Sequence, residues 1–289
     1  MNMSKKVVLI TGTSSGFGYL TALGAAEKGY NVYATMRDTQ GRNAEKAKEL
    51  QAIEGISVIE LDVTDSNGVK QAIAELISKE GRLDVLVNNA GYFGGGLAES
   101  YTDDDFEKMY DVNVKGTWRT TKAALPQMRK QGDGLIINTS SGLGRFSAPF
   151  MTVYNSTKFA VEGLTEGLHY EVRPLGVDVV MVQPGAFPTE IFNKVAYGSD
   201  QEIAAGYGDL AKVPEQVSEG MRQMFEAMKP SPQMVPDAIF KLIDTPKGER
   251  PLRTVVDAVT GEFVENANAN VKEDYTNFLT AFGMKDMLN

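Results

Sequence analysis

A glycine-rich turn between an apolar strand and a helix is the feature that most constrains this chain. Residues 7–10 form a short and entirely apolar run, typical of a parallel strand that is covered on both faces. The run leads into Thr11-Gly12-Thr-Ser-Ser-Gly16-Phe-Gly18, and a helical pattern follows until Gly29. Such a turn lets main-chain N–H groups and a helix N-terminus face a pyrophosphate. The sequence therefore predicts a nucleotide site at the end of the first strand.

Apolar runs and helical patterns alternate along most of the chain. Further strands are expected at residues 31–36, 56–61, 83–87, 135–139, 176–182 and 252–256. This alternation predicts a doubly wound, Rossmann-like α/β fold with a parallel sheet. We expect a single domain over residues 1–289, because a chain of this length buries most of its apolar surface in one core.

The composition limits the classes of function. The chain is 42% hydrophobic and 23% charged, as in ordinary globular proteins, and no segment approaches the roughly 20 apolar residues of a membrane helix. The apolar run near the start is too short for a signal peptide, so we expect a cytoplasmic location. A net charge of −9 argues against nucleic acid or an anionic membrane as the main partner. The absence of cysteine excludes thiolate metal sites, and the single histidine, His169, excludes multi-histidine sites and the usual Ser-His-Asp triad. His169 is expected to be a packing residue.

Tyr154 and Lys158 begin a helical pattern and share one face of the helix, because they are four residues apart. A phenol has a pKa of about 10, which makes it a poor proton carrier at neutral pH. A neighbouring ammonium favours the phenolate, as an acid–base catalyst requires. Ser141 follows the apolar run at 135–139, where its hydroxyl can meet that of Tyr154 over one substrate oxygen. Taken alone, the Tyr-x-x-x-Lys pair also fits a solvated helix face.

The second expected strand ends in Met36-Arg37. An acidic side chain at this point would accept a hydrogen bond from a ribose 2′-hydroxyl, whereas an arginine suits a 2′-phosphate. The sequence therefore favours NADP(H), with NAD(H) as the other possibility. As an alternative, Arg37 pairs with Asp38, or both side chains are solvated.

Two polar features lie between the glycine turn and the tyrosine. Thr102-Asp-Asp-Asp105 has the form of a capping box, and no matching ligand cluster makes it a metal site, so no metal is expected. Asn113 lies inside a helical pattern although asparagine is a mediocre helix former. Its place therefore indicates a role other than helix stability, unless it is a solvated helix residue.

These motifs occur in a fixed order along the chain. The turn of Gly12 to Gly18, Asn88-Asn-Ala-Gly91, Asn113, Ser141 and Tyr154-x-x-x-Lys158 together resemble the classical short-chain dehydrogenase/reductase family. The resemblance covers residues 6–189. Residues 32–38 and 149–154 look most like the branch of 17β-hydroxysteroid dehydrogenase and retinol dehydrogenase. The resemblance implies reversible hydride transfer between a nicotinamide and a carbonyl or secondary alcohol. It also implies a homodimer or homotetramer joined through the helices of Asn113 and Tyr154.

The resemblance implies a role for each matching residue. Tyr154 would be the general acid in reduction and the base in oxidation, and Lys158 would lower its pKa and bind the nicotinamide ribose. Ser141 would hold the substrate oxygen, with Ser140 as the next candidate, and Asn113 would complete a proton relay through water. Asp62 also fits the start of a turn, and Asn88 fits a structural role. The implied cofactor contacts are Gly12, Ser14, Ser15, Gly16, Phe17, Gly18, Arg37, Asp62, Val63, Asn89, Ala90, Gly91, Tyr154, Lys158, Pro184, Gly185, Phe187 and Thr189.

The resemblance fades after Thr189, where family members carry a substrate lid. We expect the lid at residues 190–235 and a C-terminal extension at 262–289 that packs on the lid or on a neighbouring subunit. Aromatic side chains around the catalytic stretch predict an apolar or aromatic ketone of steroid or retinoid size. Those expected to face it are Tyr92, Phe93, Leu143, Phe146, Phe150, Met151, Phe187 and Phe192.

Two other functions compete with ketone reduction. One is alcohol oxidation by an NAD-dependent dehydrogenase of the same fold, which Arg37 argues against. The other is a non-catalytic nucleotide sensor, in which the tyrosine or the lysine would be missing; this chain has both.

Overall fold

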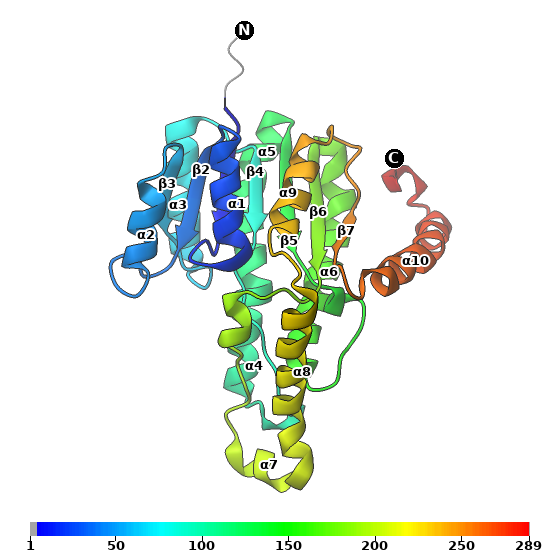
Figure 1. The fold of residues 1–289 in the computed structure, drawn as a ribbon. Coiled ribbons are helices and arrows are strands. Elements are labelled where there is room, and N and C mark those ends of the chain that lie inside the picture. Colours follow the sequence, from blue (N-terminus) through cyan, green and yellow to red (C-terminus); the bar gives the residue numbers. More distant parts are fainter. Residues whose placement is uncertain (1–4, 289) are drawn as a thin grey trace.

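The computed structural model describes residues 5–288, and a sheet of seven parallel strands lies at its centre (Figure 1). The strands are ordered β3-β2-β1-β4-β5-β6-β7. Their bounds are β1 Val7–Thr11, β2 Asn31–Met36, β3 Ile56–Glu60, β4 Val85–Asn88, β5 Gly134–Thr139, β6 Val177–Pro184 and β7 Arg253–Val256. The chain winds from β1 outward to β3 and then places β4 on the opposite side of β1. The prediction of a doubly wound α/β fold is confirmed.

Helices cover both faces of the sheet. One face carries α1 Gly16–Glu27, α2 Ala44–Gln51 and α9 Met234–Asp244, and the other carries α3 Ser66–Glu80, α5 Thr117–Gln131 and α6 Thr152–Val172. Strand β1 shows why its sequence is apolar throughout. Val8 and Ile10 belong to the first core, and Val7 and Leu9 belong to the second, because successive side chains of a strand alternate between faces.

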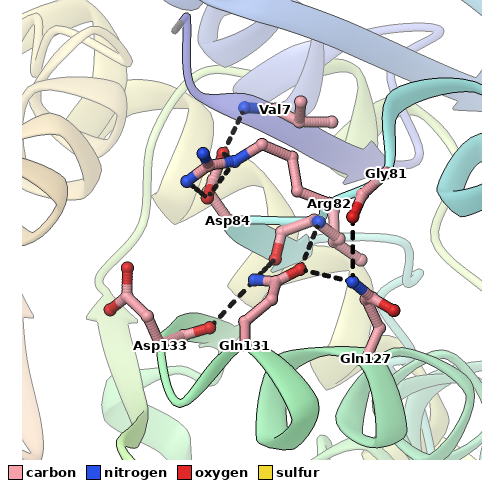
Figure 2. A network of polar contacts seen from close by, with 8 residues as sticks. Val7, Gly81, Arg82, Asp84, Gln127, Gln131 and Asp133 are labelled. Carbon is pink, nitrogen blue, oxygen red and sulfur yellow. Dashed lines mark hydrogen bonds and ion pairs between the residues drawn. The ribbon is translucent and has the colours of Figure 1, made fainter. Parts of the chain in front are cut away.

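The observed strands agree with the predicted ones within two residues at each end. The largest difference at a strand start is in β4, which begins at Val85 rather than Leu83. The Gln131 side chain explains it, because its Oε1 accepts from the Leu83 N–H at 2.9 Å and its Nε2 donates to the Leu83 carbonyl at 3.0 Å (Figure 2). A side chain thus satisfies the polar groups of Leu83 that a neighbouring strand would otherwise pair.

A nearly continuous helical path carries the capping box and Asn113. Helix α4 Asp103–Tyr110 begins at a capping box in which the Thr102 and Asp105 side chains each accept from the main-chain N–H of the other. This prediction is confirmed. A π-helical turn at Asp111–Gly116 then joins α4 to α5. Asn113 therefore lies in a widened turn, a feature frequent at functional sites.

Two segments extend beyond the sheet and its covering helices (Figure 1). Helices α7 Gln201–Gly206 and α8 Val213–Met228 project away from the sheet beside α4. Helix α10 Gly261–Ala281 leaves at the β7 edge, and a short 3-10 turn at Lys285–Leu288 follows. Tyr275 of α10 packs on Tyr170 of α6, with ring centroids 5.4 Å apart. Helix α10 therefore contacts the body of the domain, and its packing on the lid or on a neighbouring subunit stays a prediction.

Candidate active site

Two turns meet where the winding of the sheet reverses between β1 and β4. Ligands of open α/β sheets bind at such a point, outside the carboxyl ends of the strands. The Asn89 side chain donates to the carbonyls of Thr11 and Gly12 at 2.9 and 3.1 Å, and the Ala90 N–H donates to Thr11 Oγ1 at 3.0 Å. Gly12 has φ +71, and a Cβ on it would lie 2.8 Å from the Ala90 Cα. The two turns therefore form one closely packed cradle that requires glycine.

A groove of about 490 Å³ runs along this cradle. The predicted cofactor residues that line it are Gly12, Ser14, Ser15, Gly16, Phe17, Arg37, Asp62, Val63, Asn89, Ala90, Gly91 and Thr189. Gly18 has a different role, because a Cβ on it would lie 2.4 Å from Asn89 Nδ2 and from the Gly12 carbonyl oxygen. It packs α1 against the cradle. The Asn88 side chain is structural, since it donates to Thr121 and Asn138 in the interior.

The groove suits the phosphates of a dinucleotide. Ser15 is the N-cap residue of α1, but its side chain makes no capping hydrogen bond. Its hydroxyl and the first N–H groups of α1 therefore stand at the groove as donors for an anion. The site lacks side chains at Gly12 and Gly16, which leaves the backbone accessible to a ligand.

The end of the groove at β2 is basic. Arg37 Nη1 lies 3.9 Å from Asp62 Oδ2, so Asp62, and not the alternative partner Asp38, is beside it. Asp38 instead accepts from the main-chain N–H of Arg42 at 3.0 Å. Arg42 and Asn43 line the same groove and were missed by the sequence analysis. A second arginine in the polar turn after the strand was the available signal.

Tyr154 and Lys158 lie in the first two turns of α6, and both are buried. The interpretation as a solvated helix face is therefore wrong. Lys158 Nζ is 5.6 Å from the centroid of the Tyr154 ring and donates to the Thr139 carbonyl at 2.8 Å. Lys158 thus bridges from the tyrosine to the end of β5.

Burial dominates the titration of this pair. Burial raises the pKa of Tyr154 to about 12, although a hydrogen bond with the Ser141 side chain lowers it. Burial also lowers the pKa of Lys158 to about 8, and the charge of Glu162 opposes that change. Burial of the phenol therefore outweighs the groups around it that favour the phenolate, and the expectation that Lys158 lowers the pKa of Tyr154 stays a prediction.

The two adjacent serines point to different partners. Ser140 Oγ donates to the buried carboxylate of Glu162 at 2.7 Å. Ser141 Oγ accepts from the Leu143 N–H at 3.1 Å and donates to the Pro184 carbonyl at 3.4 Å. Ser141 is also the serine that hydrogen-bonds with Tyr154. Ser141 is therefore the serine beside the Tyr154 hydroxyl, and Ser140 is the serine bound to Glu162.

Asn113 is buried and joins the turn after β4 to α6. Its side chain accepts from the Tyr92 N–H and donates to the Tyr92 carbonyl, both at 3.0 Å. It also donates to Thr157 Oγ1 at 3.3 Å, next to Lys158 in the chain. The alternative of a solvated helix residue is wrong.

An apolar cavity of about 590 Å³ includes Tyr154, Ser141 and Lys158 in its lining. Residues predicted to face the substrate or cofactor that also line it are Phe93, Leu143, Phe146, Met151, Pro184, Gly185, Phe187, Thr189 and Phe192. Tyr92 lines the nucleotide groove instead. Phe150 stands outside the cavity lining, so that expectation is corrected. Its backbone is left-handed, with φ 63, and its carbonyl accepts from the Gly96 N–H at 2.7 Å.

The C-terminal part of the chain completes this cavity, which the sequence analysis missed. Asp257, Thr260, Phe263 and Val264 all line it. The Asp257 carboxylate accepts from the N–H groups of Val259 and Thr260 at 2.8 and 3.1 Å, at the start of α10. Phe263 remains 63% exposed. No local pattern connects these residues to the catalytic stretch, because they lie about a hundred positions later.

Residues 5–288 contain neither a cluster of metal ligands nor a helix suited to cross a membrane. Within that range, no group of three or more His, Asp or Glu side chains is arranged to hold a metal ion. In the same part of the chain, no helix combines the length and apolar character needed to cross a membrane. His169 is buried with its Nδ1 2.8 Å from the Val179 carbonyl, and burial lowers its pKa, as expected of a packing residue.

Known proteins are similar to this chain in sequence. Residues 6–199 match the model of the short chain dehydrogenases. Over 187 residues, the chain is 42% identical to 3-ketodihydrosphingosine reductase of Bacteroides thetaiotaomicron, covering 65% of this chain and 66% of that protein. Over 207 residues, it is 41% identical to 17-beta-hydroxysteroid dehydrogenase type 1 of Homo sapiens, covering 70% and 62%. These matches thus span about two thirds of each relative's length.

The fold agrees with the sequence match. The solved structure of ElxO with NADP bound superposes with a TM-score of 0.72 at 31% identity, covering 90% of this chain and 99% of that one. The family predicted from the glycine turn, Ser141, Tyr154 and Lys158 is confirmed. This chain belongs to the short-chain dehydrogenase family.

Proposed function

We propose that this protein is an NADP(H)-dependent oxidoreductase that transfers a hydride reversibly between the nicotinamide and a carbonyl or secondary alcohol. One observation carries the proposal: Tyr154 lies beside Lys158 and Ser141 in an apolar cavity that adjoins the nucleotide groove. Phe17 and Thr189 line both hollows. A substrate in the cavity is therefore next to a dinucleotide in the groove.

Each residue of the cluster has a proposed task. The bound cofactor supplies the hydride, and the protein supplies position and a proton. Ser141 holds the carbonyl oxygen, and the Tyr154 phenol donates its proton to that oxygen. Lys158 holds the nicotinamide ribose from the same helix face. Asn113 supports the relay that returns a proton to Tyr154, from a position fixed by Tyr92 and Thr157.

The protonation state of Tyr154 fits a proton donor. With a pKa of about 12, the phenol is protonated at neutral pH and can protonate the carbonyl oxygen in reduction. The reverse reaction uses the phenolate as the base.

Two arginines at the adenosine end of the groove support NADP(H). Arg37 and Arg42 both line this end, where guanidinium groups suit a 2′-phosphate. ElxO, a structural relative, has NADP bound. Arg37 also lies near the Asp62 carboxylate, which can partner its charge in place of a phosphate. An NAD(H)-dependent alcohol dehydrogenase is therefore the second candidate function. Fluorescence titration with NADPH and with NADH separates the two: tighter NADPH binding supports the proposal, and tighter NADH binding supports the second candidate.

The cavity supports a bulky apolar ketone as the substrate. Aromatic and aliphatic side chains from several segments surround the catalytic end, and residues 190–235, the proposed lid, contribute Ile191, Phe192 and Met221. Two of the relatives are named for a 3-ketodihydrosphingosine and a 17-beta-hydroxysteroid. The Asp257 carboxylate also faces the cavity, but its bonds to the start of α10 indicate a capping role.

The proposal is tested by following NADPH consumption with steroid, long-chain and small ketones. We expect turnover of the large ketones. In Tyr154→Phe, kcat should fall by about 10³-fold while NADPH affinity stays within about threefold, because only the proton donor is lost. Tyr170→Phe, on the same helix but outside the cavity lining, serves as the matched control. Turnover in Tyr154→Phe close to that of the control would refute the assignment of the acid.

Assembly and location complete the proposal. We propose a homodimer or homotetramer joined through α4, α5 and α6, because Trp118, Phe159 and Leu164 of α5 and α6 are large, apolar and exposed. Light scattering after gel filtration gives the mass that decides this. We also propose a cytoplasmic location.

A further inference from the structure

We propose that Glu162 is a positioning residue of the active site. From one turn beyond Lys158, its buried carboxylate holds the two strand ends that place Ser141 and puts a negative charge on the helix face that carries Lys158. The inference rests on the proposed roles of Ser141 and Lys158. It adds a residue that does not itself touch the substrate or the cofactor.

One oxygen of Glu162 joins two strand ends. Glu162 Oε1 accepts from Ser140 Oγ at 2.7 Å and from Gln183 Nε2 at 2.9 Å. Ser140 directly precedes Ser141 after β5, and Gln183 directly precedes Pro184 at the end of β6. Ser141 Oγ in turn donates to the Pro184 carbonyl. This last hydrogen bond orients the Ser141 hydroxyl. The Glu162 carboxylate holds Ser140 and Gln183, the residues that directly precede its two partners.

The other oxygen is balanced by an arginine from β7. Arg253 Nε donates to Glu162 Oε2 at 2.8 Å, and their side chains are only 13% and 5% exposed. Arg253 Nη1 also donates to Glu166 at 3.0 Å. A buried carboxylate is tolerated when charge and hydrogen bonds compensate it, as they do here. Removing Glu162 alone would leave the guanidinium and two polar side chains without that partner.

The packing around Glu162 shows that the chain leaves room for it. A Cβ on Gly144 would lie 2.8 Å from the Glu162 Cγ and 2.8 Å from Ser140 Oγ. The network also reaches α10, because Asn268 Nδ2 donates to Gln183 Oε1 at 2.7 Å. Glu162 therefore connects the catalytic helix to β5, β6, β7 and the C-terminal helix.

The charge of Glu162 acts on Lys158. The two residues are four apart in α6 and share a face. Burial lowers the pKa of Lys158 to about 8, and Glu162 is the charged group that raises it. The charged groups around Glu162 itself are Arg253, Glu166 and Arg145, and its β5 and β6 partners are neutral. Without the Glu162 charge, burial acts unopposed, and Lys158 loses its proton at a lower pH.

Glu162→Gln tests the inference, with Glu166→Gln as the matched control. Both changes remove one negative charge from α6 beside Arg253, but only Glu162 bonds to Ser140 and Gln183. In Glu162→Gln we expect kcat to fall by about 100-fold, with KM and NADPH affinity within about threefold. The alkaline limb of the pH profile should move to lower pH by about one unit. Glu166→Gln should stay close to wild type in all of these.

A measurement without substrate separates this inference from the proposed function. The pH dependence of trace acetylation of Lys158 by acetic anhydride, quantified by mass spectrometry of its peptide, reports the pKa of Lys158. We expect a lower pKa in Glu162→Gln and a return toward wild type in Glu162→Asp, which keeps the charge. If wild-type protein reduces no ketone, the proposed function fails, and this titration alone decides the inference.

Two outcomes overturn the inference. One is a Lys158 titration in Glu162→Gln that matches wild type. The other is a fall in kcat in Glu166→Gln equal to that in Glu162→Gln, since both would then act through Arg253. Should Glu162→Gln lack a cooperative unfolding transition, Ser140→Ala removes one donor and keeps the buried charge pair. Unchanged kcat in Ser140→Ala would then refute the positioning role.

Discussion

At the scale of single residues, we expect the arginines that follow β2 to set which nucleotide the groove prefers. Arg42 lines the groove together with Arg37, and unlike Arg37 it is beside Asp38 rather than Asp62. We expect Arg42→Ala to weaken NADPH binding by about 10-fold, because a charge-assisted bond to the 2′-phosphate is lost, and to leave NADH binding unchanged. Fluorescence titration with each cofactor measures both affinities.

The control for Arg42→Ala removes a positive charge from the nearby helix α2, outside the groove. Lys48 is exposed on α2 and lies outside the groove lining, so Lys48→Ala should change neither affinity by more than about twofold. An equal loss of NADPH and NADH affinity in Arg42→Ala would indicate a general disturbance of the groove. That result would contradict a phosphate contact.

At the scale of elements, we expect α10 to affect how large a substrate the cavity holds. Its first turn brings Phe263 and Val264 to the cavity, and Phe263 is 63% exposed without a substrate. A bulky ketone would cover this ring, so Phe263→Ala should lower kcat/KM for large apolar ketones by about 5–10-fold through loss of apolar contact. A small ketone should show no change. Phe278→Ala, with a side chain 54% exposed further along α10, is the matched control. Equal effects on large and small ketones would contradict a rim role for Phe263.

Elements also differ in how far the sequence predicts them. Strand β1 was predictable because it is a buried apolar run that a glycine-rich turn closes, and the capping box predicts the start of α4 from a local hydrogen-bond pattern. The spacing of Tyr154 and Lys158 predicted that they share one helix face, and the motifs around them, which resemble the family, predicted their role. Phe150 was misplaced because a left-handed backbone turns its segment, which hydropathy does not indicate. Glu162 and Arg253 are 91 residues apart, and Phe263 is still further from Ser141, so only tertiary packing brings them to the site.

At the scale of the whole molecule, the two ends of the sheet have different roles. The carboxyl ends of the strands carry the groove and the cavity, whereas a polar network ties the amino ends together (Figure 2). There, the Asp84 carboxylate accepts from the Val7 N–H at 2.7 Å and from Arg82 Nε at 2.9 Å. Asp84 is 5% exposed, so its lone pairs have no replacement from bulk water. This end therefore contributes stability without contacting either hollow.

That separation gives a prediction about stability. Asp84→Asn should lower the free energy of unfolding by about 2–4 kcal/mol, because it leaves Arg82 facing an amide and weakens the bond that begins β1. Urea denaturation measures the change, and NADPH affinity of the folded variant should stay at the wild-type value. Asp104→Asn breaks an ion pair with Lys108 whose side chains are 74% and 65% exposed, and should leave the free energy of unfolding close to the wild-type value. A loss of NADPH affinity in Asp84→Asn would show that the amino ends of the strands also control the shape of the nucleotide groove. Equal costs in the two variants would instead show that burial adds nothing to the Asp84 network.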